Sequence, residues 1–254
     1  MSYISTNLNF LITAVKKVGN SLTRDFNEIE QLQTSLRGHQ EFAKAALERM
    51  NRSLRAELQK GHPDYAFVSG REVLPSGSCF AVAPLDGALN FMHGIPYFAV
   101  SVAVIEKGQV TAGVIYNPAT ADLYFAEKGS GAFKEGYRNH ERLRVSARKE
   151  LKDALIGAVD GSLADSVAGV RFNGSLSLDL AAVAAGKLEG IISRDNPTEA
   201  FAAGILLVKE AGGYVYEYDQ KDIRTDDQLA VLNSGSLIAG NAELGAKLYA
   251  LLHK

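Results

Sequence analysis

Residues 80–104, FAVAPLDGALNFMHGIPYFAVSVAV, are the stretch around which the rest of the chain is interpreted. They contain a short apolar run, a Pro-Leu-Asp-Gly turn, residues that favour one helical turn, and a longer apolar run. This order predicts a strand, a short helix and a second strand. The amides of Gly87, Ala88 and Leu89 would then lie at a helix start, where backbone N–H groups bind anions.

Length and composition limit the class of protein. A chain of 254 residues can form one large domain or two modest ones, and its 46% hydrophobic and 22% charged residues are typical of a globular protein. The net charge of -2 gives no reason to expect nucleic acid or an anionic membrane as a partner. Cys79 is the single cysteine, which fits a reducing compartment. With no leader pattern and no long apolar run, we expect a cytoplasmic protein without a membrane partner.

The first part of the chain, residues 1–148, is predicted to be one unit. Apolar residues at helical spacing predict amphipathic helices over residues 3–30 and 45–60. Short β-type runs then follow at residues 65–68, 79–83, 97–105, 110–116 and 123–126, with edge segments at 129–133 and 143–145. Tight connections between these runs predict an antiparallel sheet that the two helices cover.

Residues 149–254 are predicted to form a second, α/β unit. Strands are expected at residues 155–159, 190–192, 214–218 and 235–239, and helices at 177–185, 198–211 and 242–252. The predicted fold class is therefore α/β in the broad sense that includes α+β, with two units of different character.

Several motifs along the chain carry a resemblance to a known family. The opening stretch is similar to the signature Asp-Pro-Ile/Leu-Asp-Gly-Thr-x-Asn-Phe, with Ala83 in place of the first Asp and Ala88 in place of the Thr. In order along the chain there follow GVIYNP at 113–118, GSGAF at 129–133, RFNGS at 171–175, DLAAVAAG at 179–186, FAAG at 201–204, EAGG at 210–213 and AGN at 239–241. Together they resemble the inositol monophosphatase family, and most closely its bacterial, extragenic-suppressor-like branch. The resemblance implies a layered α/β/α/β/α sandwich and a homodimer.

The resemblance also implies a chemistry. Family members hydrolyse phosphate monoesters with Mg²⁺, which a nest of carboxylates holds through oxygen. The phosphate rests on the amides after the signature Asp, and the signature Thr helps to orient the attacking water.

The family's five metal-binding carboxylates match positions that are mostly not acidic in this chain. These positions are Leu47, Gly70, Ala83, Asp86 and Ala200, so one carboxylate of five is kept. Leu85 keeps a position that offers only its carbonyl oxygen to the metal. Arg71 replaces a second Glu, and Ser193 replaces the Glu that family members present to substrate. We therefore predict a degraded magnesium site and expect no cofactor.

Charges next to these positions suggest an anion site without metal. Arg71 and Lys44 add positive charge beside two of the lost carboxylates, and an arginine fork pairs well with phosphate. The predicted phosphate-binding residues are Gly87, Ala88 and Arg71, for a small phosphorylated ligand. Glu72 and Glu199 are the neighbours considered as replacement metal ligands.

The sequence leaves three functions open. The first is a family-like protein that has lost metal-dependent phosphatase activity and retains phosphate or anion binding. The alternative is an active phosphomonoesterase on inositol phosphate or a related sugar phosphate, with Mg²⁺ at Asp86 and the Leu85 carbonyl. The third is a protein-interaction role, by analogy with bacterial family members linked to the transcription apparatus.

Overall fold

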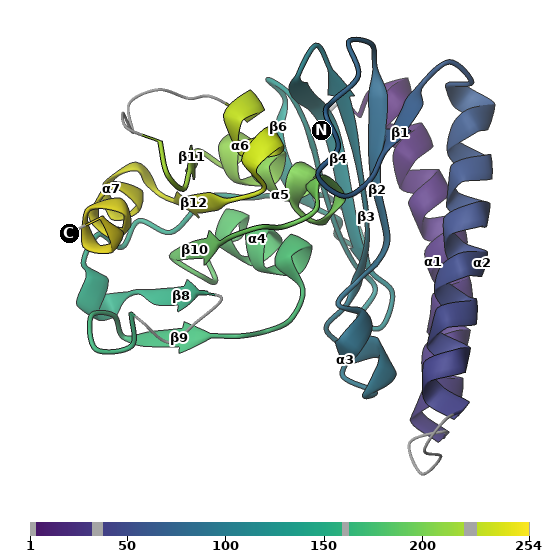
Figure 1. The fold of residues 1–254 in the computed structure, drawn as a ribbon, viewed down its shortest axis with the longest axis horizontal. Helices are drawn as coiled ribbons and strands as arrows, with labels where there is room; N and C mark the ends of the chain where they lie inside the picture. The colour runs from purple at the N-terminus through teal and green to yellow at the C-terminus, as the bar shows by residue number, and fades with distance from the viewer. Residues whose placement is uncertain (1–3, 32–37, 159–162, 221–227, 254) are drawn as a thin grey trace.

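The computed structural model describes residues 4–31, 38–158, 163–220 and 228–253, and its elements form five layers (Figure 1). Helices α1 (Thr6–Gln31) and α2 (Gly38–Gly61) cover one face of a seven-stranded sheet. Helices α4 (Leu176–Ala184) and α5 (Thr198–Glu210) lie between that sheet and a five-stranded sheet. Helix α7 (Ala242–Leu252) packs on the second sheet. The predicted α/β/α/β/α sandwich is confirmed.

The seven strands of the first sheet follow one another in chain order. They are β1 (Ala66–Val68), β2 (Cys79–Asp86), β3 (Ala99–Glu106), β4 (Gln109–Asn117), β5 (Asp122–Glu127), β6 (Gly131–Lys134) and β7 (Glu141–Arg142). The antiparallel prediction is wrong at one edge, because β1 pairs parallel with β2. The intervening residues 69–78 are longer than a hairpin turn, so they can return the chain to the same end of the sheet.

The predicted edge segment at residues 143–145 is also misplaced. The edge strand is β7, which lies just before it, and only the Leu143 amide continues the pairing, to the Ala132 carbonyl at 2.8 Å. The second predicted helix begins earlier than expected, at Gly38, because its polar first turns are accommodated at the surface.

The second sheet has the strand order β11-β12-β10-β8-β9. Its strands are β8 (Leu155–Gly157), β9 (Gly169–Arg171), β10 (Gly190–Ser193), β11 (Tyr214–Glu217) and β12 (Leu237–Gly240). The expected strand over 155–159 ends at Gly157, and residue 159 lies outside the described residues. The last strand begins at Leu237 and not at 235, because Gly235 has a φ of 69° and forms a turn.

Three short elements had no counterpart in the sequence prediction. They are the strand β9, the helix α6 (Gln228–Ser234) and a 3-10 turn at Leu151–Asp153. Each is too short for hydrophobic periodicity to mark it. The one helical turn expected after the opening Asp-Gly is present as α3 (Ala88–Met92).

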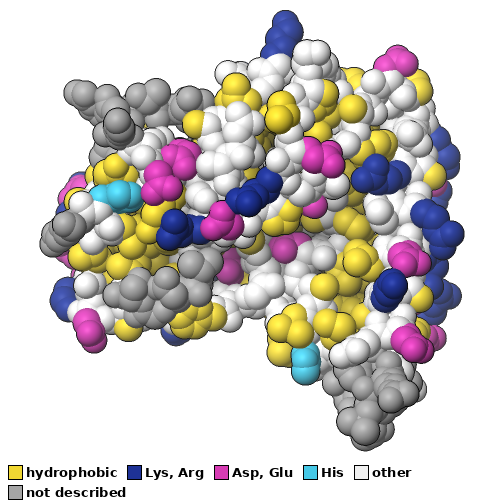
Figure 2. Space-filling model, in the orientation of Figure 1, with side chains coloured by type: hydrophobic (Ala, Val, Ile, Leu, Met, Phe, Trp, Pro, Cys, Tyr) yellow, Lys and Arg dark blue, Asp and Glu magenta, His cyan; other side chains and the backbone are white. Residues whose placement is uncertain are grey.

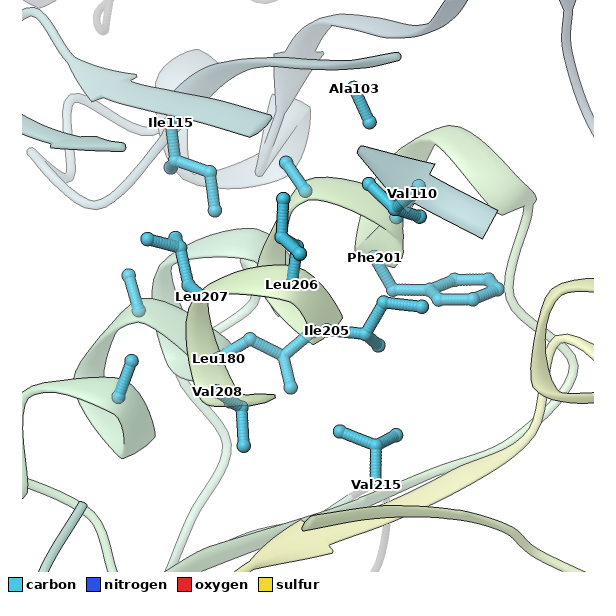
Figure 3. Close-up of a cluster of buried hydrophobic side chains, with 14 of the residues drawn as sticks. Ala103, Val110, Ile115, Leu180, Phe201, Ile205, Leu206, Leu207, Val208 and Val215 are labelled. Carbon is cyan, nitrogen blue, oxygen red and sulfur yellow. The ribbon is translucent and has the colours of Figure 1, made fainter. Parts of the chain in front are cut away.

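Side-chain size alternates along the central strands and determines which helices approach them. On β2 and β3 the larger Phe80, Val82 and Val102 face the layer of α1 and α2. The smaller Ala99 and Ala103 face α5, whose own buried side chains fill the space between the two sheets (Figure 3). A Cβ at Gly113 would lie 3.0 Å from the Ala203 Cα. Small residues therefore bring α5 close to the first sheet, and the candidate site lies along this contact.

Among the described residues, no helix is both long enough and apolar enough to cross a bilayer.

Candidate functional site

An irregularity in β2 directs Asp86 toward the middle layer. Ala83 pairs with Ser101 and Asp86 pairs with Ala99, so β2 has one residue more than β3 over this interval. Such a bulge reverses the alternation of the following side chains. Leu85 consequently packs with the α1–α2 layer, and Asp86 points toward the start of α4. Pro84 lies in the bulge, where its missing N–H costs no ladder hydrogen bond.

The Asp86 carboxylate is bound by the first residues of α4. Its Oδ2 accepts hydrogen bonds from Ser175 Oγ at 2.6 Å, Ser177 Oγ at 2.5 Å and the Ser177 amide at 2.8 Å. Both serines are at most 1% exposed. Ser175, the residue before the helix, makes no capping bond with its own side chain. Asp86, on β2 of the first sheet, thus caps the start of α4. Its charge lies at the positive end of the dipole of that helix.

Two opposing effects act on the pKa of Asp86. Burial raises the pKa, because it removes water from the charged form. The hydrogen bonds from Ser175, Ser177 and the Gly87 amide lower it, and the balance leaves the pKa above its ordinary value. The Gly87 amide therefore donates a hydrogen bond to the Asp86 carboxylate.

A second carboxylate, Asp179, lies one turn further along α4. Its Oδ1 accepts hydrogen bonds from the Tyr97 hydroxyl and from Asn173 Nδ2, both at 2.7 Å. Burial raises the pKa of Asp179 to about 6, the two hydrogen bonds oppose this rise, and the nearby Asp86 charge adds to it. Burial and the Asp179 charge also raise the pKa of Tyr97.

Asp86 and Asp179 both line a cavity of about 450 Å³ between the two sheets. Its other polar side chains are Asn173, Ser175, Ser193 and Asn196, and Phe172, which is 61% exposed, lies at its edge. Its lining, as far as the structure describes the chain, includes no lysine or arginine. The cavity thus offers hydroxyl, amide and carboxylate groups without a compensating cation.

Two of the positions that the motifs match to metal ligands lie at this cavity or close to it. Ala200, 8% exposed, lines it from the first turn of α5, and Ala83, 6% exposed, lies on β2. Ser101 is opposite Ala83 on β3, and its buried Oγ has no hydrogen-bond partner in the described part of the chain. The methyl group of Ala83 therefore lies where the carboxylate of an aspartate could accept a hydrogen bond from the Ser101 hydroxyl.

The other two lost positions lie apart from the cavity lining. Leu47 is partly buried against the hydrophobic cluster of the α1–α2 layer. Gly70 is held at the start of α5: its amide donates to Glu199 Oε2 at 2.9 Å, and its carbonyl accepts from the Thr198 amide at 2.7 Å. Glu199 is thereby engaged in positioning the 69–78 connection, and Glu72 is exposed. Neither replaces a missing ligand.

The predicted anion-binding residues are not gathered in one place. Arg71 pairs with Asp195 at 2.6 Å, and both side chains are more than half exposed. Lys44 is exposed on α2. Ala88 packs with the α1–α2 cluster at the start of α3, next to the Gly87 amide described above. Arg71 is absent from the cavity lining.

Among the described residues, few side-chain oxygen ligands for a magnesium ion are brought together. Mg²⁺ requires near-octahedral coordination by oxygen, usually including one or two carboxylates. In the described ranges no three His, Cys, Asp or Glu side chains are grouped so that they could hold a metal. Asp86 Oδ2 already accepts three hydrogen bonds, and the side chains of Ala83 and Ala200 have no oxygen to add.

Comparison with known proteins identifies the fold's relatives. The model of the inositol monophosphatase family matches residues 4–254. This chain belongs to the inositol monophosphatase family. It is 39% identical to an inositol-1-monophosphatase of Rhizobium meliloti, over 98% of this chain and 97% of the relative. It is 31% identical to the Nus factor SuhB of Xylella fastidiosa, over 95% of this chain and 92% of the relative.

A solved structure agrees with this assignment. The extragenic suppressor protein SuhB from Bartonella henselae superposes with a TM-score of 0.84 at 36% identity, covering 99% of this chain and 100% of that one. The family membership predicted from the motifs is confirmed across the whole length, and so is the family fold.

Several residues of this family member's site were not predicted. Ser177, Tyr97 and Asn173 take part in the carboxylate network, and although Tyr97 and Asn173 lie in motifs quoted above, the sequence assigned no role to these residues. The Ser-Leu-Ser sequence at 175–177, directly before a helical apolar run, was the available hint, since serine favours helix starts. Nothing local indicated that those serines would meet Asp86.

Asp179 should make stability fall as pH rises from about 4 to about 6. Its folded-state pKa is raised from 3.8 to about 6, so the folded protein holds the proton more tightly and loses that advantage as the group ionises. The lost stability is about 3 kcal/mol for a shift of this size. Urea unfolding at several pH values should show this decline relative to Asp179→Asn, whose amide oxygen can still accept both hydrogen bonds. Exposed Asp64→Asn is the matched control, and a wild-type-minus-Asp179→Asn difference independent of pH would contradict the assignment.

Proposed function

We propose that this protein binds a small polar ligand in the cavity between its sheets and does not hydrolyse phosphate monoesters through Mg²⁺. The observation that carries the proposal is the state of the five metal positions. Four have no acidic side chain, and at the fifth, Asp86, Oδ2 accepts three hydrogen bonds from the start of α4. The cavity, with its hydroxyl, amide and carboxylate lining, supports the binding part of the proposal.

The lining favours an uncharged, hydroxyl-rich ligand. Asp86 and Asp179 would repel a phosphate dianion, and no described lining residue is a cation. Hydroxyl groups of a polyol can instead donate to these carboxylates and accept from Asn173, whose Nδ2 carries a second hydrogen besides the one donated to Asp179. Phosphate binding through Gly87, Ala88 and Arg71 stays a prediction, to be compared directly with polyol binding.

Calorimetric titration with myo-inositol and with inorganic phosphate distinguishes the two ligands. We expect saturable binding of myo-inositol that Ser193→Leu weakens, because Ser193 lies in the lining and Leu fills the cavity. Arg71→Ala should leave myo-inositol binding unchanged. Phosphate binding that Arg71→Ala abolishes would instead support the anion site and contradict the polyol assignment.

Restoring the lost ligands should create a metal site. We expect no Mg²⁺ binding by wild type in calorimetry, and binding by the triple variant Gly70→Glu, Ala83→Asp and Ala200→Asp. A Cβ at Gly70 would meet nothing within 4 Å, although the φ of 68° there strains any side chain, and Ser101 can donate to a carboxylate at 83. The uncharged triple variant with Gln, Asn and Asn at these positions is the matched control. Wild-type binding at one Mg²⁺ per chain would overturn the proposal.

The second candidate function is an active Mg²⁺-dependent phosphomonoesterase on inositol phosphate or a related sugar phosphate. It is favoured by the relatives at 36–40% identity, which carry the name inositol-1-monophosphatase. These names agree better with an active enzyme than with a loss of activity. A steady-state assay with inositol 1-phosphate and Mg²⁺ separates the candidates, since saturable turnover above a heat-inactivated sample would establish the enzyme.

Two further expectations stay predictions. The homodimer is supported by the exposed apolar side chains Leu89, on α3, and Ile95, just after it. Figure 2 shows apolar side chains at the surface in the region that α3 occupies in Figure 1. Sedimentation as a monomer would exclude it. The protein-interaction role agrees with the name of one relative, Nus factor SuhB. A pull-down that enriches no protein would count against this role.

A further inference from the structure

Phe172 is the single aromatic side chain in the described lining of the Asp86 cavity, and it is 61% exposed. The structure describes all 11 phenylalanines of the chain, and the other phenylalanines are buried or partly buried. Within the described residues, Phe172 belongs to none of the three hydrophobic clusters, and its ring pairs with no other aromatic ring or cation. Neither core packing nor a ring contact therefore accounts for this side chain.

The backbone on both sides of Phe172 is held by hydrogen bonds. Before it, Arg171 ends β9, and the Arg171 carbonyl accepts from the Ala158 amide at 3.1 Å. After it, the Asn173 carbonyl accepts from Asn90 Nδ2 of α3 at 2.7 Å. The second sheet and α3 therefore fix the position from which the Phe172 ring extends to the edge of the cavity.

Polar groups of the cavity follow Phe172 directly in the chain. Asn173 Nδ2 donates to Asp179 Oδ1 at 2.7 Å, and Ser175 Oγ donates to Asp86 Oδ2 at 2.6 Å. All of these residues line the cavity together with Phe172. Residues 172–175 therefore combine an apolar ring with groups that position two carboxylates, and carboxylates accept hydrogen bonds from ligand hydroxyls.

A ring-shaped polyol matches this combination of groups. Its hydroxyl groups extend mainly outward from the ring, and its two faces carry C–H groups. The face of a phenyl ring is electrically negative, so it attracts C–H groups and shields them from water. An acyclic polyol has no fixed C–H face, and it loses internal rotation when it binds. The exposed ring of Phe172 therefore favours the cyclic ligand.

We propose that Phe172 determines specificity in the Asp86 cavity by stacking on the C–H face of a ring-shaped polyol, a cyclitol or a pyranose sugar. This inference rests on the polyol-binding function proposed above. The carboxylates of Asp86 and Asp179 accept ligand hydroxyls inside the cavity. Phe172 covers the face of the ligand that would otherwise stay in water, and this contact adds affinity without a charge.

Tryptophan fluorescence tests the stacking contact. The chain contains no tryptophan, so Phe172→Trp introduces a single fluorophore at the edge of the cavity. Titration with myo-inositol should shift its emission to shorter wavelength in a saturable manner, because stacking removes water from the indole ring. Tyr137→Trp, at a fully exposed position elsewhere, is the matched control and should not respond. An emission shift that follows protein concentration without any polyol would show that a second copy covers the ring, and would contradict the inference.

Calorimetry with two polyols tests the specificity. Sorbitol is acyclic and has the same number of hydroxyl groups as myo-inositol. Phe172→Ala should weaken myo-inositol binding by about tenfold and sorbitol binding by much less, whereas Phe172→Tyr should retain the wild-type preference. Equal weakening of both polyols, or unchanged binding of both, would overturn the inference and leave the proposed function standing. Absence of myo-inositol binding by the wild type would overturn both.

Discussion

The contact between Asp86 and the first residues of α4 is the interaction on which the arrangement of the two sheets around the cavity depends. Asp86 belongs to the first sheet, and Ser175 and Ser177 lie at the start of α4, between the two sheets. Hydrogen bonds to a charged carboxylate are stronger than neutral ones, and leaving such a group buried without them is costly. The Asp86 carboxylate therefore accepts hydrogen bonds from the start of α4, connects the first sheet to this helix, and lines the cavity.

The same layer contains two positions that the motifs match to metal ligands and that are alanine in this chain. Ala83 and Ala200 lie in the layer where α5 packs closely on small side chains of the first sheet. A carboxylate buried in such a layer is stable only with a metal or hydrogen-bonding partners around it. The methyl groups of Ala83 and Ala200 fit this close packing and bring in no charge that needs partners. Asp86, by contrast, is buried beside the hydrogen-bond donors that the start of α4 supplies.

Much of the architecture could be predicted from local pattern and motif order. The long helices and the central strands repeat apolar residues at clear periods, and the family motifs drew attention to Asp86 and Ala200, which both line the cavity. The parallel pairing of β1 and the short β9 and α6 could not be predicted, because their hydrogen bonds are set by tertiary contacts. The hydrogen-bond partners of Asp86 and Arg71 are about 90 or more positions away in the sequence, and no local sequence signal specifies these contacts.

Anomalous X-ray scattering from crystals grown with Mn²⁺ is the most direct test of the central claim, because Mn²⁺ prefers the same oxygen ligands as Mg²⁺. The account predicts no anomalous peak beside Asp86 and a carboxylate still bound by Ser175 Oγ, Ser177 Oγ and the Ser177 amide. A fully occupied peak within coordination distance of Asp86, with the carboxylate turned away from these serines, would contradict it.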